Sequence, residues 1–169
     1  MKNIKNKNII IIPIFMFALG AILGVISKVL DLYTSNLGNI FSQLSIWILI
    51  GTVIAIFSHT KMKAAINVFL FCIGMLITYY VTAELSHSIY GMTFIYGWSA
   101  FSLCSPVFAW FTWMTKEKGI FPKIISVGIL LVTLLASIVI FRGPRIYDLV
   151  ILLVLAYFLF IHKINRYAD

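Results

Sequence analysis

Long apolar runs separated by short polar segments form the main pattern of this 169-residue chain. Runs of about 20 apolar residues are long enough to cross the hydrocarbon region of a bilayer as α-helices. The pattern therefore predicts an all-α, polytopic membrane bundle that forms a single domain. The predicted transmembrane helices, six in number, cover residues 8–32, 37–58, 64–85, 94–114, 122–141 and 148–162.

The basic residues predict the orientation of this bundle. Short cytoplasmic connections of membrane proteins are enriched in Lys and Arg. An even number of helices puts both termini on one side, and a cytoplasmic assignment places 10 of the 13 basic residues there. The exceptions, which fall on the predicted outer side, are Lys28, Arg142 and Arg145.

Composition supports a membrane protein and argues against a soluble domain and a nucleic-acid-binding protein. Apolar residues make up 62% of the chain and charged residues 11%, which leaves too little polar surface for a soluble domain of this size. The net charge of +8 lies in connections and termini, whereas a nucleic-acid binder would cluster it on one face. The basic N-terminus and first apolar run resemble a signal peptide. The run is too long and lacks a small-residue cleavage site, so a retained first helix is expected.

The stretch from Ala64 to His87 places polar residues on one helix face. Tyr80, Glu84 and His87 follow one another at steps of four and three residues, which are neighbouring positions on a helix. A carboxylate near the end of a membrane-spanning helix is costly unless it meets a partner or water. Glu84 is therefore expected to have one or the other.

The first predicted helix carries a second polar face. Gly20, Gly24 and Lys28 follow at steps of four, with Asp31 three residues further on. Gly20-x-x-x-Gly24 allows close approach of another helix, either within the bundle or from a partner membrane or ATPase subunit. Lys28 and Asp31 either pair with each other or belong to a solute or proton site.

Polar residues in the other helices predict contacts between helices. Gln43, which Trp47 follows on the same face, is expected to link helices at membrane depth. Pro106 removes the backbone bond to the carbonyl of Ser102, so a nearby serine repairs this carbonyl or a cavity opens there. Cys72 lies in an apolar run and is expected to act as a small hydrophobe, as is Cys104.

The charges of the predicted outer side have two explanations. Three cations and three anions nearly balance there, and a histidine adds a group that titrates near neutral pH. They form either a structural ion-pair network or an outward-facing pocket for a small anionic or zwitterionic solute. The candidate solute-binding residues are Lys28, Asp31, Tyr80, Glu84, His87, Arg142, Arg145 and Asp148.

Enzyme signatures are weak in comparison. The sequence contains no His-Glu-x-x-His metal motif, Gly-x-Ser-x-Gly elbow or phosphate-binding glycine loop. Glu84 and His87 alone are too few to define a reaction. No catalytic residue, metal site or cofactor is therefore predicted.

Two resemblances add to this picture. The stretches GNIFSQLSIWILIGT, FCIGMLITYY and FTWMTKEKGIFPKIIS resemble a family of small uncharacterised bacterial six-helix membrane proteins, which implies a bacterial plasma-membrane location but no activity. In architecture alone, the chain is similar to the substrate-binding subunits of energy-coupling-factor transporters. Those proteins meet their transmembrane partner through an Ala-x-x-x-Ala face on helix one, where this chain has Gly20-x-x-x-Gly24.

The leading hypothesis is a transport-related membrane subunit that binds a small solute near the outer side. Lys28, Arg142 and Arg145 would receive the anionic part of the solute, and a partner chain would supply ATP-driven energy. A second hypothesis is a non-catalytic accessory protein, such as an assembly or immunity factor, whose outer charges are structural. A third is a membrane-embedded enzyme that acts on lipid. Lipid contact is common to all three, and nucleic acid is not an expected partner.

Overall fold

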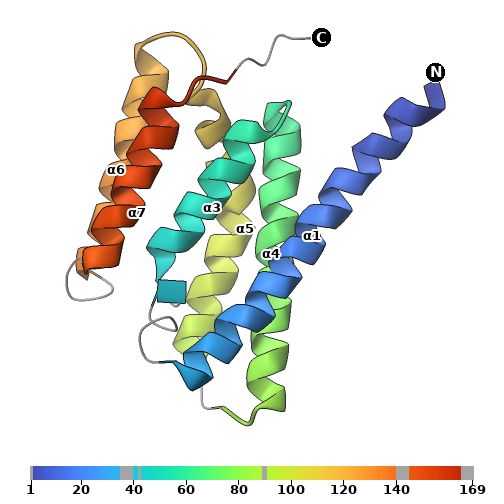
Figure 1. Ribbon diagram of the computed structural model, residues 1–169, viewed down its shortest axis with the longest axis vertical. Coiled ribbons are helices and arrows are strands. Elements are labelled where there is room, and N and C mark those ends of the chain that lie inside the picture. Colours follow the sequence, from blue (N-terminus) through green and yellow to red (C-terminus); the bar gives the residue numbers. More distant parts are fainter. Residues whose placement is uncertain (1, 35–39, 42, 89–90, 140–144, 165–169) are drawn as a thin grey trace.

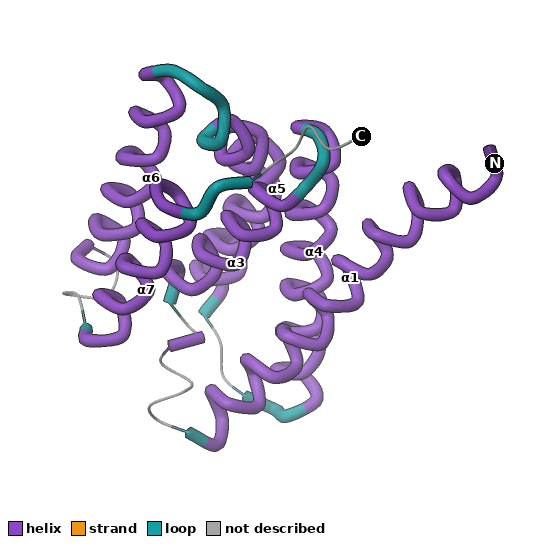
Figure 2. Tube along the Cα trace, turned by 45° about the horizontal axis from the view of Figure 1, so that its top comes forward, coloured by secondary structure: helices purple, strands orange, loops and turns teal. Residues whose placement is uncertain are grey.

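The computed structural model describes residues 2–34, 40–41, 43–88, 91–139 and 145–164, with side chains from residue 12 onward. This part of the chain is helical and contains no strand (Figure 2). Its elements are α1 (Lys2–Tyr33), α3 (Leu44–Phe57), α4 (Lys61–Leu85), α5 (Met92–Met114), α6 (Ile120–Val139), α7 (Ile146–Ala156) and a π-helical turn, η1 (Tyr157–Ile161).

These helices confirm the predicted all-α bundle of six helices within the described residues. Four segments are long and apolar enough to cross a membrane: Ile12–Tyr33, α4, α5 and α6. The remaining two, α3 and α7 with η1, are shorter apolar helices. Apolar runs predicted the helices well because a continuous run of this length has no competing way to satisfy its backbone in lipid.

The second predicted helix, expected from residue 37, is interrupted at Gln43. Residues 40–41 are helical, Gln43 has an extended backbone with φ −92° and ψ 146°, and α3 begins at Leu44. The side chain of Gln43 contacts Tyr147 and Asp148 of α7. Residues 37–39 lie outside the described part of the chain, as does residue 42.

Close packing of α1 on α4 depends on glycines. A Cβ atom added at Gly20 would overlap the carbonyl oxygen of Phe71, and one added at Gly24 would overlap Thr78 and the carbonyl of Met75. From the opposite side, Gly74 of α4 faces the backbone of α1 in the same way. The Gly20-x-x-x-Gly24 face is therefore used inside the chain, where it meets α4 rather than a separate subunit.

A hydrogen bond reinforces this contact. The Thr78 hydroxyl donates to the Ala21 carbonyl across the interface at 2.7 Å, and its oxygen also lies 3.0 Å from the Gly74 carbonyl within α4. In a membrane, small residues and hydrogen bonds of this kind replace the hydrophobic effect as the source of helix association.

The helices α3, α4 and α5 surround the main cluster of buried side chains. Trp47 of α3 packs against Phe71 of α4 with ring centroids 6.2 Å apart, and its indole N–H donates to the Phe41 carbonyl at 2.8 Å. Val68 and Ala109 complete the contact from α4 and α5. This cluster fixes the part of the bundle against which the last two helices lie.

The last two helices, α6 and α7, form an antiparallel pair on one side of the bundle (Figure 1). α7 lies against α3, whereas α6 lies behind α7 in this view and contacts α3 and α5. The start of α1 and the end of η1 lie at the same end of the bundle, and the first turns of α1 project away from the other helices (Figures 1 and 2). We call this end the terminal end and the other the opposite end.

Candidate functional site

A pocket of about 450 Å³ lies among α3, α4, α5 and α6. Ligand pockets typically have volumes of about 300–1,000 Å³, so the space suits a ligand or a hydrocarbon chain. Its rim residues Phe108, Phe111 and Val132 are 51%, 45% and 57% exposed, which places the opening between α5 and α6. The lining is almost wholly apolar and comprises Leu44, Trp47, Ile48, Gly51, Thr52, Val68, Cys72, Phe101, Ser105, Phe108, Ala109, Phe111, Thr112, Ile125, Gly128, Ile129 and Val132.

Two glycines contribute to this space by lacking side chains. A Cβ atom added at Gly128 of α6 would meet nothing within 4 Å, and one added at Gly51 of α3 would meet only Val68, at 3.7 Å. Both residues line the pocket. The glycines between α1 and α4 lie against the backbone of another helix, whereas Gly51 and Gly128 do not. The missing side chains of Gly51 and Gly128 therefore enlarge the pocket.

The proline of α5 lies beside the pocket. Pro106 cannot donate to the carbonyl of Ser102, and the hydroxyl of Ser105 donates to this carbonyl instead at 2.7 Å. The predicted repair by a serine is thus confirmed, and Ser105 also lines the pocket. The hydroxyl of Ser102 is itself buried without a hydrogen-bond partner among the described residues.

At the opposite end, Lys28 and Asp31 of α1 form an ion pair. The Lys28 ammonium lies 3.0 Å from a carboxylate oxygen of Asp31, and the side chain of Lys28 is only 4% exposed. Tyr79 of α4 joins the pair: its hydroxyl donates to Asp31 at 3.3 Å, and its ring lies 5.3 Å from the ammonium. Of the two alternatives for Lys28 and Asp31, the pairing is present, and Tyr79, which the sequence pattern did not indicate, belongs to it.

A second polar group joins α7 to the start of α3. Asp148 is fully buried and caps α7, where its carboxylate accepts the backbone N–H of Arg145 at 3.0 Å. The hydroxyl of Ser45 donates to the same carboxylate at 2.7 Å. Asp148 thus connects α7 to α3 through two residues, Ser45 and Asp148, that are 103 positions apart in sequence.

Gln43 extends this group toward Arg145. When the amide nitrogen of Gln43 faces the carboxylate, it donates to Asp148 at 3.0 and 2.5 Å, whereas the reverse orientation brings two acceptors together. Its oxygen then accepts from the Tyr147 hydroxyl at 3.3 Å. Arg145 donates to this hydroxyl at 2.6 Å, so a chain of hydrogen bonds connects its guanidinium to the buried carboxylate. The expectation that Gln43 links helices is confirmed.

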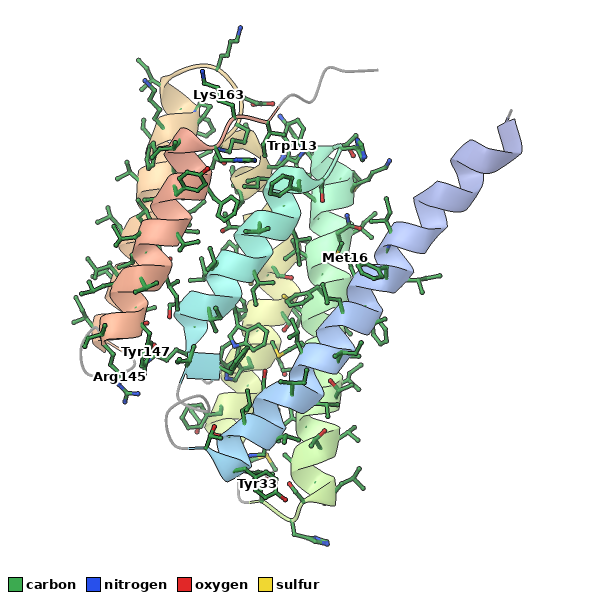
Figure 3. The ribbon with its side chains drawn as sticks, in the orientation of Figure 1. Met16, Tyr33, Trp113, Arg145, Tyr147 and Lys163 are labelled. Atoms are coloured by element: carbon green, nitrogen blue, oxygen red, sulfur yellow. The ribbon has the colours of Figure 1, made fainter. Side chains whose placement is uncertain are left out.

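The eight residues proposed to bind solute are therefore arranged as follows. Lys28 and Asp31 belong to the α1–α4 group, and Arg145 and Asp148 belong to the α3–α7 group. Tyr33, the last residue of α1, lies at the opposite end, as do Arg145 and Tyr147 (Figure 3). Glu84 and His87 are exposed at the end of α4, and Tyr80 is half-buried with its ring 5.3 Å from that of Tyr79. Arg142 lies outside the described residues.

The terminal end carries its own polar contacts. The Lys61 ammonium lies 3.0 Å from a carboxylate oxygen of Glu117 and 5.4 Å from the ring of Trp113, whose indole N–H donates to the Ser58 carbonyl at 2.8 Å. These contacts connect the start of α4 to the end of α5. Trp113 and Lys163 mark this end in Figure 3.

Lys116 caps the last helical turn of the chain. Its ammonium donates to the carbonyl of Leu159 at 3.1 Å, to that of His162 at 2.7 Å and to that of Phe158. The last carbonyls of a helix lack partners within the helix, and a cation there is favourable. Lys116 thus ties α5 to η1 at the terminal end, as Asp148 ties α7 to α3 at the opposite end.

We expect Lys116 to react slowly with an amine-reactive reagent. Its ammonium is engaged by three carbonyls, whereas Lys118, two residues later, is exposed and makes no ion pair among the described residues. Limited acetylation of the purified protein, followed by peptide mass spectrometry, should modify Lys118 several-fold faster than Lys116. Equal rates at the two lysines would contradict the cap.

Several of these features could not be found by sequence reasoning. Pro106 indicated that a cavity could open beside α5, but the pocket is formed by residues of four helices, and the contribution of Gly128 in α6 gave no signal of its own. The hydrogen bonds of Tyr147 and Ser45 could not be predicted because they depend on the packing of α7 against α3. No three His, Cys, Asp or Glu side chains in the described part of the chain come together to hold a metal ion.

The apolar helical bundle, with four helices long and apolar enough to cross a membrane, indicates the class of multi-pass helical membrane proteins. Within that class, residues 4–131 match the model of a family of unknown function, DUF6518, and the chain belongs to this family. This agrees with the resemblance to an uncharacterised family. No curated protein and no solved structure matches the chain, and nothing supports a similarity to energy-coupling-factor transporters.

Proposed function

We propose that this membrane protein binds the hydrocarbon chain of a lipid in the pocket among α3, α4, α5 and α6. The observation that carries the proposal is an almost wholly apolar space of about 450 Å³ that opens between two apolar helices. In a bilayer, that opening faces acyl chains. A chain that enters it exchanges lipid contacts for close contacts with Phe101, Phe108 and Ile129.

The residues that line the pocket favour the hydrocarbon chain of a lipid over a compact polar solute. The polar groups of the lining are mainly the hydroxyls of Thr52, Ser105 and Thr112, and none of the described residues that line the pocket is charged. A polar solute would lose its hydration there without enough hydrogen-bond partners in return. A flexible methylene chain requires none.

Filling the pocket should abolish lipid binding. The substitution Gly128→Leu adds a side chain at a residue that lines the pocket, and its Cβ atom meets nothing within 4 Å, so it reduces the cavity without a clash at Cβ. Gly97→Leu is the matched control, because Gly97 also lies in open space on a helix but does not line the pocket. Both changes replace a helical glycine and alter helix propensity equally.

The measurement uses a lipid with a photoreactive diazirine in its acyl chain, incorporated into nanodiscs with the protein. We expect crosslinked peptides from α5 and α6 in the wild type and in Gly97→Leu, and a loss of these peptides in Gly128→Leu. Crosslinking that is evenly spread over all lipid-facing helices in the wild type would overturn the proposal.

The hypothesis of a transport subunit that binds a small solute through its charged residues stays a prediction. The contacts of Lys28 with Asp31 and of Arg145 with Tyr147 are also what the structural ion-pair account expects. The alternatives of an accessory protein or a lipid enzyme remain compatible with a lipid-binding pocket, and the crosslinking experiment bears on both.

A further inference from the structure

We infer that the lipid in this pocket is held through its ester carbonyls, which accept hydrogen bonds from the hydroxyls of Thr52 and Thr112. The inference rests on the proposed function and adds the chemical class of the lipid and two residues that select it. It follows from where these hydroxyls lie, which partners they lack and what a hydrocarbon chain alone would leave unpaired.

Thr52 and Thr112 belong to the faces of α3 and α5 that line the pocket. Thr52 lies one turn after Ile48 on α3, and Thr112 lies one turn after Phe108 on α5. All of these residues line the pocket, and residues four apart share a helix face. The pocket therefore has one threonine on each of two helices that contact each other.

Both threonines are buried without a hydrogen bond. Thr52 is 3% exposed and Thr112 is 7% exposed, and neither hydroxyl has a hydrogen-bond partner in the part of the chain that the structure describes. Elsewhere in this chain, the hydroxyls of Thr78, Thr82 and Thr133 each donate to a carbonyl of their own helix four residues earlier. Because Thr52 and Thr112 make no such bond, their hydroxyls are available to a ligand.

The two hydroxyls open onto the pocket. Ser102 also has an unpartnered hydroxyl, but its oxygen is fully enclosed by protein, whereas those of Thr52 and Thr112 are not enclosed in this way. The space that these two threonines line is the pocket. An unpaired hydroxyl in an apolar surrounding is unfavourable, and a methylene chain offers it no acceptor. A ligand with oxygen acceptors between α3 and α5 is therefore favoured over a hydrocarbon chain alone.

The ester region of a diacyl lipid supplies such acceptors. It carries two uncharged carbonyl oxygens near each other, and it is attached directly to the chains that the apolar lining would hold. Thr112 lies two residues before the end of α5 and Thr52 five before the end of α3, within about 8 Å of those ends at a helical rise of about 1.5 Å per residue. The two ends are joined, because the Trp113 indole donates to the Ser58 carbonyl. Both hydroxyls thus lie toward the interfacial depth of a bilayer, where lipid esters are found.

The test compares a diacyl phosphatidylcholine with its dialkyl ether analogue, in nanodiscs made with equal amounts of both. The two lipids share the headgroup, chain length and diazirine position, and their crosslinked peptides differ in mass because the ether lacks the ester carbonyls. The variant T52V/T112V removes both hydroxyls. T133V is the matched control, because Thr133 is also buried but donates to its own helix and does not line the pocket. Crosslinking to α5 and α6 is measured for each lipid.

We expect the wild type and T133V to favour the ester lipid about tenfold, the effect of two hydrogen bonds between neutral groups. T52V/T112V should lose this preference while both lipids still crosslink, and T52S/T112S should keep it because both hydroxyls remain. A preference that survives in T52V/T112V would overturn the ester contacts, as would its loss in T133V or in T52S/T112S.

The wild type separates this inference from the proposed function. Equal use of the ester and ether lipids, with crosslinks concentrated on α5 and α6, would refute the ester contacts alone. Crosslinks from both lipids that are spread evenly over the lipid-facing helices would refute the proposed function itself.

Discussion

Asp148→Ala should give the least stable folded protein among single substitutions at the opposite end of the bundle. The change leaves the Ser45 hydroxyl, the Gln43 amide and the backbone N–H of Arg145 without their shared acceptor. An unpaired buried donor costs about 1–3 kcal/mol. Allowing for relaxation, we expect a loss of about 3 kcal/mol or more in the free energy of unfolding.

The measurement is unfolding in a mild detergent with increasing denaturing detergent, followed by circular dichroism. Asp148→Asn retains one side-chain oxygen and should lie between the wild type and Asp148→Ala. Glu117→Gln is the control, because this carboxylate is 36% exposed and its pair with Lys61 is worth at most about 1 kcal/mol. If the Asp148 and Glu117 variants unfold alike, Asp148 does not hold α7 to α3.

Gly20→Ala should separate α1 from α4, although alanine is the better helix former. Its Cβ atom would overlap the Phe71 carbonyl oxygen, and backbone cannot turn aside as a side chain can. Overpacking of this kind costs about 1–3 kcal/mol. Alanine gains about 1 kcal/mol in helix propensity over glycine. This gain offsets only part of an overpacking cost near the upper end of that range.

Gly51→Ala provides the matched control on α3. The added methyl group there meets only Val68, at an ordinary contact distance of 3.7 Å, so this variant should be as stable as the wild type or more so. Thermal unfolding in detergent, monitored by thiol labelling of buried Cys72, would rank the two variants. A Gly20→Ala protein as stable as Gly51→Ala would show that α1 does not pack closely on α4.

Sequence pattern predicted the helices but not how polar groups pair between them. The apolar runs determined the number of helices because their length leaves few other structures in lipid. The pattern also identified Gln43 as a link between helices and Gly20 as a point of close approach. It grouped Lys28, Glu84 and Arg145 by their predicted side of the membrane, and that grouping does not say which helices are neighbours.

Pro106 indicated a cavity beside α5 as one of two alternatives, but the extent of the pocket was beyond sequence reasoning. A cavity is defined by atoms that are missing, and Gly51 and Gly128 look like ordinary glycines until α3 and α6 are placed together. The same residue type closes one interface and opens another in this chain. Gly20 allows contact because backbone lies directly opposite, whereas Gly128 leaves space because nothing does.

The pairing of α1 with α4 has a consequence for the order of synthesis. α1 leaves the ribosome before α4, and α4 follows only after the whole of α3 has been made. Until then the helix must stay in the membrane with Lys28 in its sequence and without Tyr79 beside it. Asp31, three residues further along the same face, neutralises that ammonium within the helix itself. The newly made α1 can therefore stay in the membrane until α4 is synthesised, with the charge of Lys28 already paired.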